Sequence, residues 1–233
     1  MKKQITILTG AGISAESGIS TFRDADGLWE NQRIEDVATP EAWERNPELV
    51  QEFYNLRRKQ LYDVEPNAAH FAITELQRKF DVQVITQNVD DLHERAGNEY
   101  VLHLHGELKK VRSTGFPYQV YKLEGWELQM GNVCENGHQL RPHIVWFGED
   151  VPNLGLAAEL VAQSAGIIIV GTSLNVYPAA GLYKYAPTNC PIWIVDPKAN
   201  KLQYPSSITP INEKAGAALP RLVQSLLKEE ITL

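Results

Sequence analysis

The chain has 233 residues, 43% of them hydrophobic, which is enough to bury the core of one large domain with a smaller inserted one. Its formal net charge of −7 argues against nonspecific binding to nucleic acid or to an anionic membrane surface, since both would repel an acidic protein. No apolar run reaches the length of a membrane span, and the first one begins too early to follow a signal peptide. The two cysteines, Cys134 and Cys190, are too few for a disulfide framework. We therefore expect a cytoplasmic protein.

Apolar and β-branched residues at 5–9 lead directly into the sequence Gly-Ala-Gly at 10–12. The pattern predicts a buried strand that turns into a helix, whose first N–H groups can bind a pyrophosphate. Gly10 would allow the tight turn, and Gly12 would allow the backbone to approach an anion closely. The next glycine, Gly18, follows six residues after Gly12 instead of three, so a glycine-rich turn without a ligand also explains the pattern.

Two helices are predicted to begin in the same way, at residues 39–41 and 46–48. Each start has a capping residue, a proline at the first helical position and an acid in the first turn. The second of these helices should continue to about Leu61. Further helices are expected at 67–80, 156–163 and 217–228.

Strands are predicted at 82–86, 101–104, 167–170 and 191–195. The last two are uninterrupted apolar runs, which are typical of strands buried on both faces of a parallel sheet. Because helices alternate with these strands, the sequence predicts an α/β fold with a doubly wound parallel sheet. Residues 108–143 break this alternation with glycines among aromatic and polar residues, and we interpret them as an inserted, irregular β module.

Polar or small residues follow four of the predicted strands, at the sheet edge where ligands bind in such folds. They are Gln87-Asn88-Val89-Asp90, His105-Gly106-Glu107, Gly171-Thr172-Ser173 and Asp196. His105 is a candidate general base because a neutral imidazole near pH 7 can take a proton. Lone histidines are more often structural, so its position alone does not decide its role.

The other strand-end residues have two interpretations each. Asp196 would either accept hydrogen bonds from ribose hydroxyls or form a turn. Thr172 and Ser173 would donate to a phosphate or a ribose, or supply ordinary loop polarity. Asn88 and Asp90 would orient a carboxamide and a ribose, or cap a turn.

Six motifs in order carry a resemblance to a known family. They are Gly-Ala-Gly-Ile-Ser at 10–14, Thr-Phe-Arg at 21–23, Gln-Asn-Val-Asp at 87–90, Leu-His-Gly-Glu-Leu at 104–108, Val-Trp-Phe-Gly-Glu at 145–149 and Gly-Thr-Ser-Leu at 171–174. Over nearly its full length the chain resembles the sirtuins, or Sir2 family, which are NAD-dependent protein deacylases. The resemblance implies a single catalytic domain over residues 1–233. Its large Rossmann-like subdomain would take in about 1–24, 66–107 and 144–233, and its small subdomain about 25–65 and 108–143.

The resemblance also implies the chemistry and the partners, which are NAD and an acyl-lysine peptide bound from opposite sides of a cleft. In sirtuins the acyl oxygen attacks C1′ of the nicotinamide ribose as nicotinamide leaves. The histidine that matches His105 then accepts a proton from the ribose hydroxyls, and Asn88 and Asp90 belong to the same catalytic group by their match. The products are free lysine, nicotinamide and 2′-O-acyl-ADP-ribose.

The same match assigns a binding role to residues throughout the chain. Asp196 stands where many sirtuins have asparagine, and its carboxylate can only accept hydrogen bonds from the ribose. The peptide would add as a strand between loops that contain Phe147, Gly148 and Val176. The cofactor-binding residues would be Gly10, Ala11, Gly12, Ser14, Ala15, Phe22, Arg23, Gln87, Asn88, Asp90, Gly171, Thr172, Ser173, Asp196 and Ala215.

Tyr54 and Arg57 lie three residues apart on a predicted helix, so their side chains face the same way. The pair resembles the Tyr-x-x-Arg pair of the sirtuins that remove succinyl and malonyl groups, where it binds the acyl carboxylate. Ala25 matches the small residue that leaves room for a longer acyl chain. The alternative is that residues 57–59 are simply a solvated basic face.

Most sirtuins carry two Cys-x-x-Cys pairs for a structural zinc in the irregular module. Here Ser113 and Phe116 stand in place of the first pair, and the second pair retains Cys134 but has Gly137 as its partner. One thiolate cannot make a tetrahedral site, even with His138 or His143 added, so we predict that zinc is absent. An aromatic and apolar core would then hold the module together, formed by Phe116, Tyr118, Tyr121, Trp126 and Leu140.

The sequence leaves two alternatives to protein deacylation. The eroded metal site suggests a non-catalytic NAD sensor, although a protein that only binds NAD would not need a base such as His105. Mono-ADP-ribosyl transfer or NAD hydrolysis would use the same bond cleavage with another acceptor. Release of nicotinamide that depends on an acylated peptide separates these functions.

Overall fold

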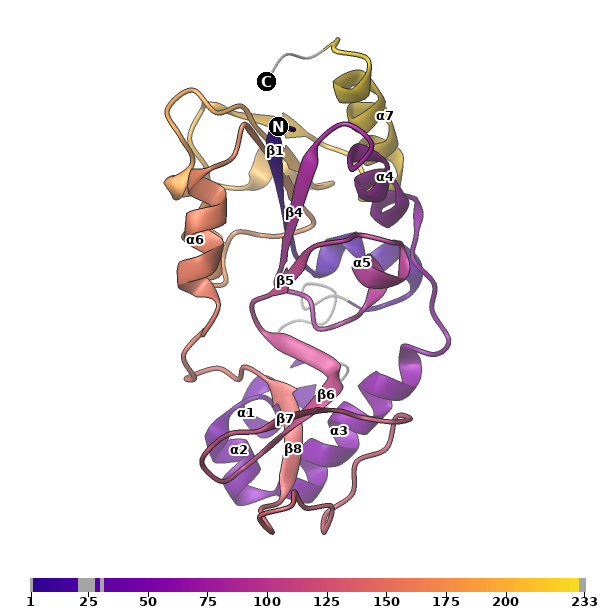
Figure 1. Cartoon of the computed structure of the whole chain (residues 1–233), viewed down its shortest axis with the longest axis vertical. Helices are drawn as coiled ribbons and strands as arrows, with labels where there is room; N and C mark the ends of the chain where they lie inside the picture. Colours follow the sequence, from indigo (N-terminus) through magenta and orange to yellow (C-terminus); the bar gives the residue numbers. More distant parts are fainter. Residues whose placement is uncertain (1, 21–27, 30–31, 231–233) are drawn as a thin grey trace.

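The computed structural model of the chain describes residues 2–20, 28–29 and 32–230. Its larger part is a six-stranded parallel sheet in the order β11-β10-β9-β1-β4-β5 (Figure 1). The strands are β1 (Gln4–Thr9), β4 (Asp81–Thr86), β5 (Val101–His103), β9 (Gly166–Val170), β10 (Ile192–Val195) and β11 (Ile208–Ile211). The sequence did not predict β11. The predicted α/β class is confirmed.

The order of the strands locates the place where a ligand is expected. From β1 the chain builds the sheet outward to β4 and β5, and it later returns to the other side of β1 with β9, β10 and β11. The topological switch point therefore lies between β1 and β9. In open α/β sheets, ligands bind outside the carboxyl ends of the strands at this point.

Helices cover both faces of the sheet, as a doubly wound fold requires. On one face, α4 (Ala68–Leu76) and α7 (Ala215–Leu227) pack on buried residues of β1, β4, β9 and β10. On the other face lie α6 (Leu154–Ala162) and the 3₁₀ segments η3 (Ala179–Tyr185) and η4 (Ala199–Lys201). Figure 1 shows α6 on one side of β1 and β4 and the pair α4 and α7 on the other.

The smaller part of the molecule lies beyond the carboxyl edge of this sheet (Figure 1). Its antiparallel sheet has the order β7-β6-β8, and its helices share one buried cluster with residues of β6 and β8. The elements are the hairpin β2 (Leu28–Trp29) and β3 (Gln32–Arg33), helices α1 (Ile34–Val37), α2 (Pro40–Arg45) and α3 (Pro47–Gln60), and strands β6 (Gly106–Ser113), β7 (Val120–Lys122) and β8 (Leu140–Ile144).

Side-chain caps begin the helices where the sequence predicts. The side chain of Thr39 accepts a hydrogen bond from the Ala42 N–H at 3.0 Å, and Asn46 accepts one from Leu49 at 3.1 Å. Asn67 caps α4 in the same way, but α4 ends at Leu76, four residues before the predicted end, and continues as a turn. A short helix, α5 (Leu92–Arg95), follows the loop after β4.

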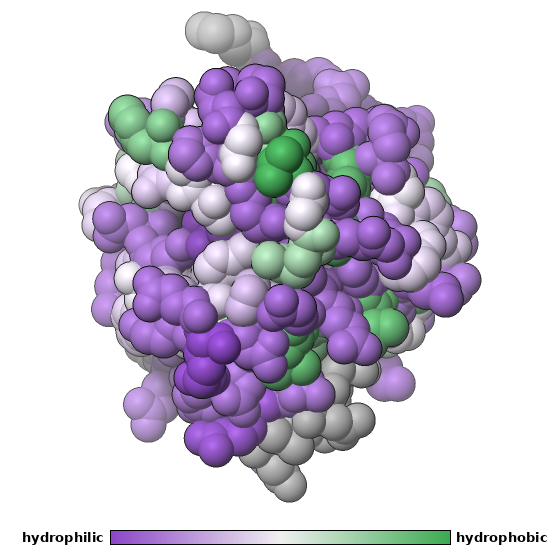
Figure 2. Space-filling view, turned by 90° about the horizontal axis from the view of Figure 1, so that it is seen from below, coloured by the Kyte–Doolittle hydropathy of each residue, from purple (hydrophilic) through white to green (hydrophobic). Residues whose placement is uncertain are grey.

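Two further observations concern the outside of the molecule. Among the described residues, no helix is long and apolar enough to cross a membrane. Figure 2 views the smaller part from below, where hydrophobic residues are scattered among hydrophilic ones over the coloured surface. This coloured face therefore offers no broad apolar patch to a partner.

Candidate active site

A cavity of about 760 Å³ lies between the carboxyl edge of the large sheet and the smaller part. This volume is within the range of about 300–1,000 Å³ that is typical of ligand sites. Of the residues predicted from sequence, those that line it are Gly10, Ala11, Gly12, Ala15, Gln87, Asn88, Asp90, His105, Gly171, Thr172, Ser173, Asp196 and Ala215, together with Tyr54, Phe147, Gly148 and Val176.

The other predicted residues are not among those that line the cavity. Phe22, Arg23 and Ala25 lie outside the described residues. Ser14 is fully buried behind the wall, and Arg57 lies one turn along α3 from Tyr54.

The prediction of a helix directly after β1 was wrong. The chain instead makes two 3₁₀ turns, η1 (Ala11–Ile13) and η2 (Ala15–Ser17). The N–H of Gly12 donates to the Gly171 carbonyl at 2.8 Å, and a Cβ on Gly12 would lie only 2.6 Å from the Gly171 Cα. Packing alone therefore explains why these positions are glycine, because the backbones of the turns after β1 and β9 are in direct contact at the switch point.

Gly171→Ala should destabilise the fold strongly. Gly171 has φ +62°, and an added Cβ would lie 2.3 Å from the Ile13 nitrogen, so both backbone strain and a clash oppose it. We expect a loss of at least about 2 kcal/mol in the free energy of unfolding, measured by urea denaturation. The matched control is Gly155→Ala in α6, where the added Cβ meets nothing within 4 Å. Alanine there should stabilise by up to about 1 kcal/mol, and equal effects of the two changes would contradict this account of the switch point.

Asn88 and Asp90 are tied together behind the cavity wall by Ser14. The Ser14 hydroxyl donates to Asp90 Oδ2 at 3.0 Å and accepts from Asn88 Nδ2 at 3.1 Å. Burial raises the pKa of Asp90 to about 6, against hydrogen bonds from the Leu92 N–H and Ser14 that lower it. The carboxylate is thus ionised above that pH and held in one orientation.

His105 has the protonation state that a general base needs. Its Nδ1 lies 3.1 Å from the Gln87 carbonyl oxygen, which can only accept, so Nδ1 carries the proton and Nε2 the lone pair. Burial lowers the pKa of His105, although the bond to Gln87 opposes this, and the ring is therefore neutral near pH 7. The backbone is fixed on either side, since the Leu104 N–H donates to the Thr86 carbonyl at 2.9 Å and the His105 carbonyl accepts from the Val145 N–H at 2.9 Å.

Both sequence interpretations of Asp196 are compatible with its position. Its Oδ1 accepts the Lys198 N–H at 2.8 Å, which is the expected turn, and the residue also lines the cavity. Lys198 and Lys214 line the cavity too, and sequence reasoning missed them. Both lysines lie close in sequence to the predicted residues Asp196 and Ala215, and this proximity could have indicated them.

The wall formed by the smaller part is mainly apolar. Tyr54 lines it together with Ile34, Ala38, Ile144 and Trp146, and Trp146 Nε1 donates to the Tyr54 hydroxyl at 3.1 Å. Burial raises the pKa of Tyr54, so the phenol keeps its proton. Arg57 is half-buried, with its guanidinium carbon 5.2 Å from the centre of the Phe53 ring.

The interpretation of residues 57–59 as a solvated basic face is wrong for Arg58. This side chain is 1% exposed, and burial lowers its pKa to about 10. Its Nη1 donates to the Trp126 carbonyl at 2.8 Å and to the Asn55 side chain. Arg58 therefore connects α3 to the irregular module.

The predicted aromatic core of that module was wrong in part. Phe116 is 84% exposed and Tyr118 is 65% exposed, because both lie on the connection between β6 and β7. Hydrogen bonds from α3 hold the module instead: Gln51 donates to the Leu140 carbonyl at 3.0 Å, and the Asn55 amide exchanges two bonds with the backbone of Leu128. The absence of zinc stays a prediction.

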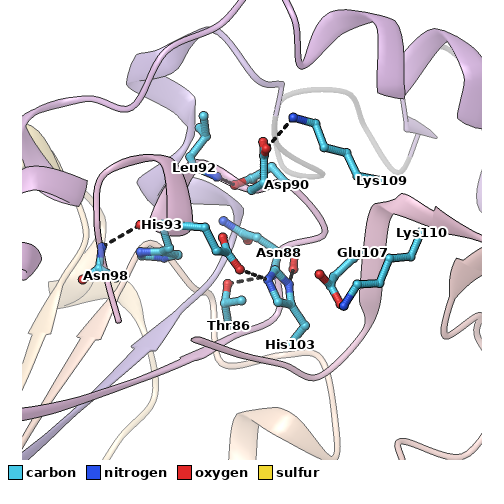
Figure 3. A network of polar contacts seen from close by, with 12 residues as sticks. Thr86, Asn88, Asp90, Leu92, His93, Asn98, His103, Glu107, Lys109 and Lys110 are labelled. Atoms are coloured by element: carbon cyan, nitrogen blue, oxygen red, sulfur yellow. Dashed lines mark hydrogen bonds and ion pairs between the residues drawn. The ribbon is translucent and has the colours of Figure 1, made fainter. Parts of the chain in front are cut away.

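Among the described residues, Glu94, His103 and Glu107 lie close together, but each already has an ion-pair partner, so we do not assign them as metal ligands. Glu94 pairs with His103 at 2.8 Å. Glu107 pairs with Lys110 at 2.6 Å, and Figure 3 shows these two side chains next to each other. Sequence reasoning missed this group, although His103 lies only two residues before the candidate general base His105.

Comparisons with known proteins show the family to which the chain belongs. The Sir2 family model matches residues 10–178, so the chain belongs to the Sir2 family. A Helicobacter pylori (strain ATCC 700392 / 26695) protein named NAD-dependent protein deacylase is 53% identical over 97% of this chain and 98% of its own length. A Bacteroides thetaiotaomicron protein of the same name is 50% identical over 97% and 98%. The crystal structure of a Sir2 homologue in complex with NAD matches with a TM-score of 0.85 and 38% identity, covering 98% of this chain and 91% of that one.

Proposed function

We propose that the chain is an NAD-dependent protein-lysine deacylase, and that it removes succinyl and malonyl groups as well as acetyl groups. Membership of the Sir2 family and relatives named NAD-dependent protein deacylases support the reaction. The observation that carries the proposal is the neutral His105 at the cavity, whose Nε2 lone pair lies at the same wall as Asn88 and Asp90.

The cavity has the dimensions and the donor set for NAD. Backbone and side-chain groups at the switch point line one side, and the ribose-binding candidate Asp196 belongs to the same wall. NAD, when bound, supplies the reactive C1′ of the nicotinamide ribose and the hydroxyls that receive the acyl group. Gln87, Asn88 and Asp90 would hold its nicotinamide and ribose, and Thr172, Ser173 and Ala215 its adenosine side.

The residues of this chain would then perform two tasks. Asn88 and Asp90, fixed by Ser14, would hold and orient the nicotinamide ribose. Nε2 of His105, which carries the lone pair, would accept a proton from a ribose hydroxyl when NAD is bound. The products are deacylated lysine, nicotinamide and 2′-O-acyl-ADP-ribose.

The acyl preference rests on α3. Tyr54 lines the cavity with a protonated hydroxyl, and Arg57 follows one turn later on the same helix. A guanidinium and a phenol together suit a terminal carboxylate, which acetyl lacks and which succinyl and malonyl carry. A peptide strand bound near Phe147, Gly148 and Val176 would present the acyl-lysine from the outside.

The test is NAD-dependent nicotinamide release with matched peptides that carry unmodified, acetylated or succinylated lysine. We expect release only with the acylated peptides, and a higher kcat/KM for the succinylated one. Release that is equal with the unmodified peptide would indicate NAD hydrolysis or ADP-ribosyl transfer. NAD binding without release would indicate a sensor, and either result would refute the deacylase proposal.

A further inference from the structure

A second histidine, His103, lies directly behind the loop that carries Asn88 and Asp90. It is 8% exposed, at the end of β5, and does not line the cavity. Figure 3 shows its ring beside Asn88, with Glu107 and Lys110 to one side. The reaction described above gives it no task.

Three consecutive carbonyls of this loop are held from the segment 103–108. The Gln87 carbonyl accepts from His105 Nδ1 at 3.1 Å, and the Asn88 carbonyl from His103 Nδ1 at 2.9 Å. The Val89 carbonyl accepts from the Leu108 N–H at 2.8 Å. Two of these three donors are imidazoles, so the position of the loop depends on their protons.

Unlike His105, His103 faces an acceptor with each of its ring nitrogens. Nδ1 faces the Asn88 carbonyl, and Nε2 lies 2.8 Å from a carboxylate oxygen of Glu94. Both contacts are hydrogen bonds only when both nitrogens carry protons, which makes the ring an imidazolium. Burial lowers the pKa of His103, but the hydrogen bond and charge of Glu94 outweigh this and raise it.

The charged groups around His103 come from several elements. Glu94 belongs to α5 and Glu107 to β6, where Lys110 pairs with it. Asp90 lies on the loop after β4, and the buried His93 of α5 has a pKa well below the ordinary value and stays neutral. Glu94, Glu107 and Asp90 all favour the imidazolium, and the charge of Lys110 lowers the pKa of Glu94.

If His103 became neutral, its hydrogen bond to the Asn88 carbonyl would break, whereas its hydrogen bond to Glu94 would remain. A carboxylate is the stronger acceptor, so neutral His103 would keep its proton on Nε2. Nδ1 would then turn a lone pair toward the Asn88 carbonyl oxygen, and the two would repel each other. Asn88 and Asp90 would lose the support that fixes them at the cavity.

We propose that His103 and Glu94 are a positioning pair, in which the protonated ring anchors the Asn88 carbonyl and thereby makes NAD binding dependent on pH. This inference rests on the cofactor site proposed above. NAD should bind most tightly between the Asp90 pKa of about 6 and the raised pKa of His103, and its affinity should fall as the pH rises through the latter.

The experiment measures the Kd of NAD by calorimetry, without peptide, from about pH 6 to about pH 9. We expect the Kd of the wild type to rise about tenfold over this range, the effect of one lost hydrogen bond next to a buried carbonyl. Glu94→Gln should abolish the rise, because a neutral His103 can then donate from Nδ1 to Asn88 while the introduced side-chain amide donates to Nε2. His103→Gln should abolish it too, since glutamine does not titrate.

The matched control is Glu75→Gln, which removes an exposed carboxylate paired with Arg78 on the surface of α4. It should retain the wild-type dependence. Titration of the His103 ring by NMR gives a readout independent of NAD, and its pKa should lie above about 6.5 in the wild type and fall in Glu94→Gln. A wild-type pKa below this value, or an unchanged pH dependence in Glu94→Gln, would overturn the inference. A wild type that binds no NAD at any pH would instead refute the cofactor site itself.

Discussion

His105→Ala should lower kcat for both acetylated and succinylated peptides by a factor of about 10²–10⁴, the usual contribution of a positioned general base. The ring is neutral, with its Nε2 lone pair at the cavity, and the bond from Nδ1 to the Gln87 carbonyl fixes that tautomer. Alanine removes the proposed acceptor for the ribose proton but leaves the apolar wall formed by the smaller part. We therefore expect kcat to fall much more than the affinity for peptide, measured by nicotinamide release and by peptide titration.

The pH profile gives an independent check on this residue. A base acts only when it is unprotonated, so the wild-type rate should fall as the pH decreases through the His105 pKa, which burial places below the ordinary value of about 6.5. The control is His138→Ala, an exposed histidine of the irregular module, which should keep the wild-type kcat. If His105→Ala retained nearly full kcat, the proton acceptor would have to be another group at the cavity.

Features that depend on neighbouring residues could be predicted from the sequence. Asn46 and Asn67 each cap the helix that follows, and the apolar run at 167–170 forms the strand β9 at the centre of the sheet. The polar residues after the strands meet at one cavity because the carboxyl ends of parallel strands share one edge. The Sir2 family and the α/β fold are confirmed, whereas the boundaries of the two subdomains stay a prediction.

Features that depend on distant residues could not be predicted. Gly12 is fixed by the backbone of Gly171, which no local pattern in either segment reveals. Phe116 and Tyr118 have the composition of a core but lie outside it, because polar side chains of α3 bind the module by its backbone. Hydrogen bonds of this kind leave no periodic signal in the sequence.

His103, the last residue of β5, and His105, two residues later, show the same limit of prediction from sequence. His103 and His105 both donate from Nδ1 to a carbonyl of one loop. What separates them is the partner of the other nitrogen, which is Glu94 for His103. The pKa is raised for His103 and lowered for His105, two residues apart, and only the fold determines the direction of each shift.

A chain of contacts holds Tyr54 in place at the cavity wall. Glu149 pairs with Arg141 at 2.9 Å and with Arg112 at 2.7 Å, and the Arg141 guanidinium stacks 3.5 Å from the centre of the Trp146 ring. Trp146 in turn donates from Nε1 to the Tyr54 hydroxyl. The phenol oxygen accepts this bond and the hydroxyl keeps its proton, whereas a carboxylate can only accept hydrogen bonds.

Arg57→Met should lower kcat/KM for the succinylated peptide by a factor of about 10–100 and leave that for the acetylated peptide nearly unchanged. Arginine can bind a carboxylate through two parallel hydrogen bonds, and hydrogen bonds to charged groups contribute about 1.5–3 kcal/mol. Methionine keeps the apolar stem of the side chain and removes the charge. Parallel assays with both peptides and saturating NAD measure the change in preference.

Two variants of the same helix separate recognition of the acyl group from a general effect of charge. Lys59→Met also removes a positive charge from α3, but at an exposed position 5.2 Å from the Trp126 ring, and should leave the preference unchanged. Tyr54→Phe should lower succinyl turnover by a smaller factor of about 3–10, because it removes one neutral donor and keeps the ring. Equal losses of kcat/KM for the succinylated peptide in Arg57→Met and Lys59→Met would mean that α3 attracts the substrate only through its overall positive charge. An unchanged preference in Arg57→Met would remove the assignment of succinyl and malonyl while leaving the deacylase itself intact, since neither His105 nor the loop that carries Asn88 and Asp90 belongs to this helix.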